Sequence, residues 1–225
     1  MKKIGLLVAV EIKAVFRKYY QELEKIEGDK YRIYLLKRRN YTLYIIHSKA
    51  GQIRTAAAVQ YLVDSFQVDL LVNFGVVGAL REDFEVGQTC LVHRVVHYHM
   101  DSSQADGAQI GKYFDYQDIY LYPTEKYIKK VAAMYPFIPL VTCASGDKFI
   151  GQAREKEEMA KSFDAHICDM ESAAVVLISD INKLPCFIIK TISDSLKGGF
   201  KEFQMKVEEA SDMCLSIVDD ILEII

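Results

Sequence analysis

The segment ICDMESAAVV, residues 167–176, places two carboxylates, Asp169 and Glu171, on either side of one methionine. An apolar stretch precedes the acids, and a pattern of small and apolar residues predicts a helix after them. A buried charge is costly unless it is paired or used. Either the acids begin the helix, where its dipole favours negative charge, or they serve a binding site.

A third acid stands at the end of an apolar run, in KTISDS. Because side chains alternate along a strand, we expect Lys190, Ile192 and Asp194 on one face. The LKGG that follows predicts a loop, so Asp194 stands where a buried strand opens. That position suits a proton donor, and the alternative is an Asp that caps a turn.

Two glycines, Gly75 and Gly78, follow an apolar strand in NFGVVGAL. They could let the backbone approach a ligand, and a tight structural turn is the alternative. Their G-x-x-G spacing is not the dinucleotide fingerprint, and the chain has no Walker A pattern. In CASGDKFIG, Phe149 and Ile150 predict either a loop whose ring stacks on a flat ligand or a turn with one hydrophobic anchor.

Three histidines, His93, His97 and His99, lie in VHRVVHYHMD. His97 and His99 would share a face of a strand, so a metal site is one interpretation. No cysteine or carboxylate except Asp101 completes a ligand set, which favours solvated or hydrogen-bonded histidines. We therefore predict neither a metal nor an organic cofactor.

The composition is that of an ordinary globular domain: 225 residues, 51% hydrophobic, 26% charged, with a formal net charge of −3. The charged residues form no basic stripe for a nucleic acid and no cluster for an anionic membrane. No window is apolar enough for a membrane helix. Five cysteines without a C-x-x-C pair indicate reduced thiols and a cytoplasmic location.

The apolar pattern predicts strands alternating with helices, which indicates an α/β layered fold in one domain, residues 1–225. The expected strands cover residues 4–10, 31–36, 43–47, 70–74, 90–96, 140–143 and 186–192. The expected helices cover residues 11–25, 52–66, 124–134, 153–164, 170–182 and 202–225. In such folds sites gather where strands end, which is where the acids and the aromatic segment stand.

Together, NFGVVGAL, ASGDKFI, CDMESAA and KTISDS occur in the order and approximate spacing of the nucleoside phosphorylase/nucleosidase superfamily. Over essentially the whole chain the sequence most resembles the 5′-methylthioadenosine/S-adenosylhomocysteine nucleosidases. The resemblance implies a three-layer α/β/α fold with a mixed, partly closed central sheet, and a homodimer. It also implies hydrolysis of the N-glycosidic bond of a purine nucleoside, giving free adenine.

The resemblance assigns a role to each candidate. Glu171 would accept hydrogen bonds from the ribose hydroxyls, and Met170 would pack against the sugar. Asp194 would protonate purine N7, with Ser193 orienting it. Three further residues would contact the base. The Phe149 ring would stack on the purine, the Ile150 backbone would hydrogen-bond to the purine edge, and Gly78 would let the backbone approach the ligand closely.

The chemistry suits these residue types. A purine anion is a poor leaving group until it is protonated, and a positioned acid contributes roughly 10²–10⁴-fold. A carboxylate near the sugar favours the positive charge that develops in the transition state.

Three positions depart from the family pattern. Val76 stands where a serine is usual, and Lys190 replaces an arginine. An ungapped alignment of IGLLVAVEIKAV puts Lys13 where the nucleosidases have the glutamate that activates water, with Glu11 two residues earlier.

Asn73 and Val76 replace the Arg and Ser that hexameric phosphorylases carry in this segment, which favours water over phosphate as the nucleophile. A phosphorylase with an unfamiliar phosphate site, and a nucleoside-binding protein with weakened catalysis, are the alternatives.

Overall fold

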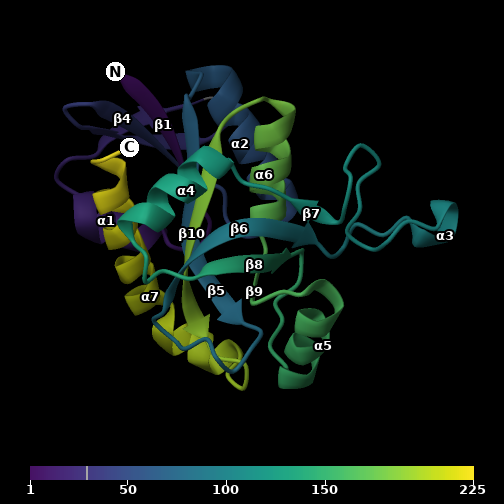
Figure 1. The fold of residues 1–225 in the computed structure, drawn as a ribbon. Coiled ribbons are helices and arrows are strands. Elements are labelled where there is room, and N and C mark those ends of the chain that lie inside the picture. The colour runs from purple at the N-terminus through teal and green to yellow at the C-terminus, as the bar shows by residue number, and fades with distance from the viewer. Residues whose placement is uncertain (29) are drawn as a thin grey trace.

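The computed structural model describes residues 1–28 and 30–225 and has ten strands in one sheet, with helices on both of its faces (Figure 1). The strands are β1 (Lys2–Val8), β2 (Glu24–Glu27), β3 (Arg32–Lys37), β4 (Tyr41–His47), β5 (Leu70–Ala79), β6 (Thr89–His97), β7 (Tyr120–Leu121), β8 (Leu140–Ser145), β9 (Ile167–Asp169) and β10 (Cys186–Asp194). The helices are α1 (Ile12–Tyr19), α2 (Gln52–Phe66), α3 (Ser103–Asp106), α4 (Glu125–Met134), α5 (Ala153–Phe163), α6 (Ser172–Ile181) and α7 (Phe200–Leu222).

The sheet is mixed and partly closed. Its strand order is β10-β6-β8-β9-β5-β1-β4-β3-β2, and β10 also pairs with β5. That extra pairing closes a ring through β5, β10, β6, β8 and β9, while β1 to β4 extend from it as an open sheet. The α/β architecture with a mixed, partly closed sheet is therefore confirmed.

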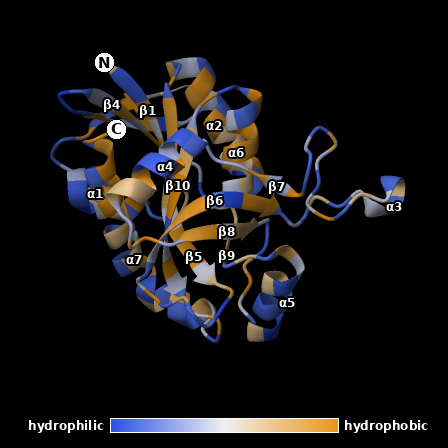
Figure 2. Cartoon of the chain, in the orientation of Figure 1, coloured by the Kyte–Doolittle hydropathy of each residue, from blue (hydrophilic) through white to orange (hydrophobic). Residues whose placement is uncertain are grey.

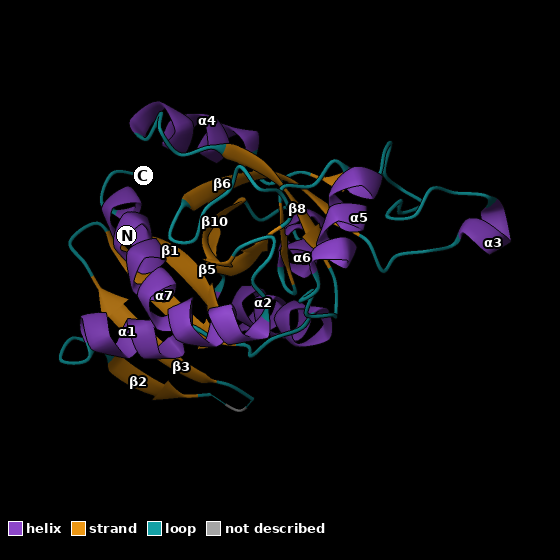
Figure 3. Cartoon of the chain, turned by 90° about the horizontal axis from the view of Figure 1, so that it is seen from below, coloured by secondary structure: helices purple, strands orange, loops and turns teal. Residues whose placement is uncertain are grey.

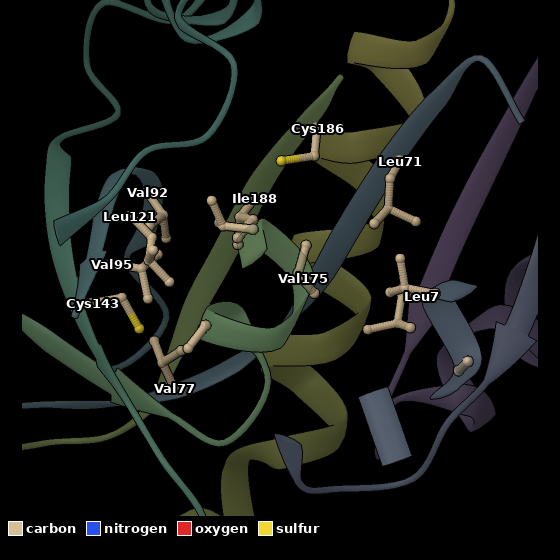
Figure 4. Close-up of a cluster of buried hydrophobic side chains, with 14 of the residues drawn as sticks. Leu7, Leu71, Val77, Val92, Val95, Leu121, Cys143, Val175, Cys186 and Ile188 are labelled. Atoms are coloured by element: carbon tan, nitrogen blue, oxygen red, sulfur yellow. The ribbon is translucent and has the colours of Figure 1, made fainter. Parts of the chain in front are cut away.

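Apolar side chains on the two faces of the sheet form separate cores. One core joins the sheet to α2 and α6, and ten of its residues are labelled in Figure 4, among them Leu7, Val77 and Val175. The other core joins the sheet to α1, α4 and α7, and α1 lies along α7 (Figure 3). The strands are mainly apolar and the helices carry hydrophilic outer faces (Figure 2), as expected where each helix buries one stripe.

The long elements agree with the sequence pattern within a few residues, apart from a shorter α1 and a longer β5. The pattern did not predict the short elements β2, β7, β9 and α3, and the segment that carries α3 projects away from the sheet (Figure 1). Gly75 and Gly78 do not form a turn, because both lie inside β5, which continues to Ala79. Among the helices described, none is long and apolar enough to cross a membrane.

Candidate active site

A pocket lies where the carboxyl ends of β1, β5 and β10 meet the segment between β9 and α6. This is where α/β sheets usually bind ligands. Six of the residues singled out in the sequence line it: Gly78, Phe149, Met170, Glu171, Ser193 and Asp194. The seventh, Ile150, lines a smaller adjoining pocket together with Phe149, Met170 and Asp194. The structure thus brings the sequence-predicted residues together.

Glu11 lies at the pocket, where the ungapped sequence alignment would have placed Lys13. It follows β1, is only 4% exposed and lines the pocket. Its Oε2 accepts hydrogen bonds from the backbone N–H groups of Ala9 (3.1 Å) and Val10 (2.9 Å), and its Oε1 accepts one from Val76 N–H (2.9 Å). These bonds fix the carboxylate in one orientation toward the pocket.

Lys13 does not face the pocket. Its side chain is 75% exposed and its Nζ lies 2.9 Å from Glu208 Oε1 on α7. The ungapped alignment is therefore wrong at this position, because the chain turns into α1 directly after Glu11 and carries Lys13 to the outer face. The signal that could have identified Glu11 was its place immediately after the first strand.

Gly75 makes room for Glu11. A Cβ atom on Gly75 would lie 2.6 Å from Glu11 Oε1 and 3.4 Å from Lys190 Nζ. Gly78 has the same function at the other end of the pocket, where a Cβ atom would lie 3.0 Å from Asp194 Oδ2. The two glycines of β5 thus let carboxylates approach the strand from the neighbouring elements.

The acids Asp169 and Glu171, which frame Met170, have different functions. Asp169 is the last residue of β9, and its carboxylate accepts hydrogen bonds from Ser172 N–H (3.2 Å) and Ser172 Oγ (2.5 Å) at the start of α6. Both acids line the pocket, and Glu171 Oε1 accepts a hydrogen bond from Gly51 N–H (3.0 Å). Asp169 thus holds the start of α6, as one interpretation of the segment expected, while a binding role for Glu171 stays a prediction.

Burial raises the pKa of Glu171 to about 8, and the negative charge of Asp169 adds to this effect. Burial also favours the neutral form of Asp169, but the Lys190 ammonium and two serine hydroxyls outweigh it and lower the pKa of Asp169. Glu171 is therefore the buried carboxyl of this pair that changes its charge near neutral pH.

Lys190 is 2% exposed and its Nζ lies 2.9 Å from Asp169 Oδ2. Burial opposes its charge, but the carboxylates of Asp169 and Glu171 raise the pKa of Lys190 above its usual value. The ammonium is thus committed to a buried ion pair, so the pocket lies beside a neutralised cation.

Asp194 and Ser193 both line the pocket at the end of β10, where the pairing with β5 shifts register between Ile192 and Asp194. Such an irregularity re-aims side chains that would otherwise alternate. Ser193 Oγ lies 3.0 Å from Asp194 Oδ1. On the other oxygen, Lys156 of α5 donates a 2.5 Å hydrogen bond to Asp194 Oδ2. The sequence analysis did not predict this lysine.

An aromatic group lies at the mouth of the pocket. Phe149 is 40% exposed and meets Phe203 of α7 edge-to-face, with ring centroids 5.5 Å apart. Phe200 meets it in the same way at 5.8 Å. Phe149 and Phe203 both line the pocket, which gives it a flat apolar surface suited to an aromatic ring.

The histidines considered as metal ligands have hydrogen-bond partners. His97 Nδ1 lies 2.7 Å from Tyr113 Oη, and His99 Nδ1 accepts a hydrogen bond from Asp147 N–H. Among the residues that the structure describes, no group of three or more His, Cys, Asp or Glu side chains could hold a metal ion.

Comparisons with known proteins agree with the family resemblance and the fold. A family model described as "Phosphorylase superfamily" matches residues 3–223. Aminodeoxyfutalosine nucleosidase of Campylobacter jejuni is 28% identical over 207 residues, covering 89% of this chain and 88% of the relative. A 5′-methylthioadenosine/S-adenosylhomocysteine nucleosidase of Staphylococcus aureus is 24% identical over 215 residues, covering 92% and 93%.

Solved structures resemble the whole fold. The Campylobacter jejuni 5′-methylthioadenosine/S-adenosylhomocysteine nucleosidase superposes with a TM-score of 0.88 at 25% identity, covering 100% of both chains. A mutant of the Helicobacter pylori enzyme, solved with 5′-methylthioadenosine in its active site, gives 0.92 at 19% identity and covers 100% of both chains. At that identity the second likeness concerns the fold alone.

Proposed function

Because the chain belongs to the phosphorylase superfamily, we propose that it is a nucleosidase that hydrolyses the N-glycosidic bond of a 5′-modified adenine nucleoside. One observation carries this proposal. Three carboxylic acids, Glu11, Glu171 and Asp194, come from three separate segments and line one pocket beside an aromatic ring. Glycosidic hydrolysis needs an acid for the leaving group, a stabiliser for the sugar cation and a base for water.

Asp194 is the proposed acid at the base. Phe149 would stack on the purine, with the Ile150 backbone at the purine edge and Gly78 close to the ring, which brings N7 toward the Asp194 carboxyl group. Ser193, 3.0 Å from Asp194 Oδ1, would hold that group in orientation. Protonation of N7 lets the purine leave as a neutral molecule when the bond between C1′ and N9 breaks.

Glu171 is the proposed partner of the ribose. Gly51 N–H occupies one side of its Oε1, which leaves lone pairs on both oxygens for the 2′- and 3′-hydroxyls. Met170, on the pocket wall, would pack against the sugar. As C1′ gains positive charge, the ionised form of Glu171 stabilises it more strongly than it stabilises the ground state, and this form is favoured as pH rises toward the Glu171 pKa of about 8.

Glu11 is the proposed base for water. Its carboxylate is held by three backbone N–H groups, so its remaining lone pairs point into the pocket without reorganisation. The serine expected at position 76 is not needed for this, because the contact to Glu11 is made by the Val76 backbone. We therefore assign the activation of water to Glu11.

Water is the proposed nucleophile rather than phosphate. A phosphate dianion needs cationic donors. Among the described residues that line the main pocket, none is a lysine or an arginine, and Lys190 nearby is already paired with Asp169.

The proposal is tested by supplying 5′-methylthioadenosine, S-adenosylhomocysteine and aminodeoxyfutalosine to the purified protein with and without phosphate. We expect adenine release from at least one of them at a rate that phosphate does not change. Strict dependence on phosphate would identify a phosphorylase instead. Tight binding of all three without turnover would identify a nucleoside-binding protein.

The homodimer implied by the family resemblance and the cytoplasmic location indicated by the cysteines remain predictions. Light scattering during size exclusion would measure the mass in solution, and a monomer at micromolar concentration would contradict the homodimer.

A further inference from the structure

Lys156 is buried where a lysine is unusual. It is 0% exposed and is the buried residue of α5, a helix whose other charged side chains face outward. Lysine is almost never fully buried without a partner. Its ammonium donates to Asp194 Oδ2 (2.5 Å) and to the Ser195 carbonyl (2.7 Å). The Asp194 carboxylate, the proposed acid, thus compensates for burying the positive charge of Lys156.

The ion pair stands at the edge of the pocket. Asp194 lines the pocket, whereas Lys156 does not. A Cβ atom on Gly78 would lie 3.0 Å from Asp194 Oδ2 and 3.4 Å from Lys156 Nζ, so β5 passes close to both groups. Lys156 can therefore reach the purine only through Asp194.

This contact changes what Asp194 can do. An ammonium at hydrogen-bond distance favours the ionised carboxylate. An ionised carboxylate accepts hydrogen bonds but has no proton to give to N7. The pair as a whole nevertheless keeps one transferable proton, which resides on Lys156.

We propose that Lys156 is the positioning residue of Asp194 and the source of the proton that Asp194 delivers to the leaving purine. This inference rests on the proposed nucleosidase function. An N–H bond of Lys156 breaks as an O–H bond forms on Asp194. That O–H bond breaks as N7–H forms, while the electron pair of the C1′–N9 bond moves into the purine.

The proton balance closes through water. Attack of water on C1′ releases one proton to Glu11, and the net reaction consumes one water molecule. After the purine leaves, Glu11 releases its proton to solvent and neutral Lys156 regains one from solvent, which restores the starting state. No oxidant, reductant or further reactant is needed.

Few other groups face the pair. From β9, the Cys168 thiol lies near Gly78, and burial raises its pKa to about 12, so it remains neutral. From α7, Glu202 accepts hydrogen bonds from Ser195 N–H (2.6 Å) and Ser195 Oγ (2.8 Å). Asp169 is nearby but is paired with Lys190. The Lys156 ammonium is the cation in contact with Asp194.

Lysine and arginine differ in whether they can release a proton. Arginine keeps its positive charge and its donors but is not deprotonated in proteins. Lys156→Arg therefore retains the attraction to Asp194 and removes the proton source. Lys156→Met keeps a similar length and removes both. Lys161→Met, which replaces an exposed lysine on the same helix, is the matched control.

The test compares kcat/KM across pH for an adenine nucleoside and for a nitrophenyl riboside, whose leaving group needs no proton. We expect Lys156→Arg to lower the nucleoside rate on the order of 10²-fold at neutral pH and to change the riboside rate much less. For Lys156→Met we expect the alkaline limb of the nucleoside profile to move to lower pH by at least about one unit, with recovery toward the parent rate in acid. Lys161→Met should match the parent.

Three outcomes overturn the inference: a parental nucleoside rate in Lys156→Arg, an equal loss for both substrates at every pH, or a shift of the Lys156→Met limb to higher pH. If Lys156→Arg does not fold, the Lys156→Met profile decides alone. Failure of the proposed function is distinguishable, because the parent protein would then release no adenine at any pH in phosphate-free buffer.

Discussion

The backbone N–H of Val76 donates a 2.9 Å hydrogen bond to Glu11 Oε1. Any residue except proline supplies this donor, so replacing the usual serine by valine does not remove the contact. The bond also ties the segment after β1 to the middle of β5, which places Glu11 beside the pocket. Loss of the serine hydroxyl is therefore compatible with a working nucleophile site.

Glu11→Gln keeps one amide oxygen to accept backbone N–H groups, loses the acceptor on its other terminal atom, and cannot accept the proton of water. We expect kcat for an adenine nucleoside to fall on the order of 10²-fold or more, with little change in KM. Lys13→Met is the control, since its exposed ion pair with Glu208 is worth little. Equal losses in the two variants, measured by adenine release, would remove Glu11 from the reaction.

Gly75→Ala tests the approach of Glu11 to β5. The new Cβ atom would lie 2.6 Å from Glu11 Oε1, so the carboxylate must move. We expect at least a tenfold loss of kcat, because small misplacements of a positioned group are costly. Val76→Ala keeps the backbone donor and should stay within about threefold of the parent. A fully active Gly75→Ala protein would contradict the assigned position of Glu11.

Glu171→Gln should retain the fold and remove the charge that ionised Glu171 places near the sugar cation, so the variants are compared at pH 8 or above. We expect a loss of kcat on the order of 10²-fold or more, larger than the loss of affinity for the nucleoside. Steady-state rates together with calorimetric binding separate the two effects. A variant as active as the parent would exclude Glu171 from the mechanism.

The pKa of Glu171 also predicts a pH dependence of stability. Folding raises this pKa from 4.5 to about 8, so the folded protein holds a proton that the unfolded chain has lost. The stability of the parent therefore falls as pH rises from about 4.5 to 8 and is not affected by this group above that range. Glu171→Gln lacks this loss, so its Tm relative to the parent should rise by roughly 5 °C or more between pH 5 and pH 8. A Tm difference that is constant with pH would be the contrary result.

Most of the architecture could be predicted because long elements leave a periodic pattern in the sequence. The strand before Asp194 and the helix α2 were both evident from apolar spacing. Short strands such as β9, with three residues, leave no such pattern and depend on pairing with distant parts of the chain.

Candidate pocket residues such as Glu171 and Phe149 could be named from sequence motifs together with the family resemblance, and both line the pocket. The site was not predictable where a side chain acquires its function from tertiary packing. The sequence AREKEEMAKSF contains three lysines or arginines before its last two residues, and nothing in it indicates that Lys156 turns inward. The position of Glu11 likewise depends on where β1 ends and α1 begins.

Asp194→Asn tests the acid with the same two substrates as Lys156. The amide can hydrogen-bond but has no acidic proton, so adenine nucleoside turnover should fall on the order of 10²-fold or more. A nitrophenyl riboside should be affected much less. Equal losses for both would show that Asp194 does not protonate the leaving group.

The origin of the oxygen that arrives at C1′ tests the central claim most directly. The protein is supplied with 5′-methylthioadenosine or aminodeoxyfutalosine in ¹⁸O-labelled water containing phosphate, and the sugar product is analysed by mass spectrometry after a single turnover. The account predicts a free sugar that carries the label and no sugar phosphate, with the label arriving far more slowly in Glu11→Gln. A sugar 1-phosphate as product, or labelling that is equally fast without the Glu11 carboxylate, would contradict it.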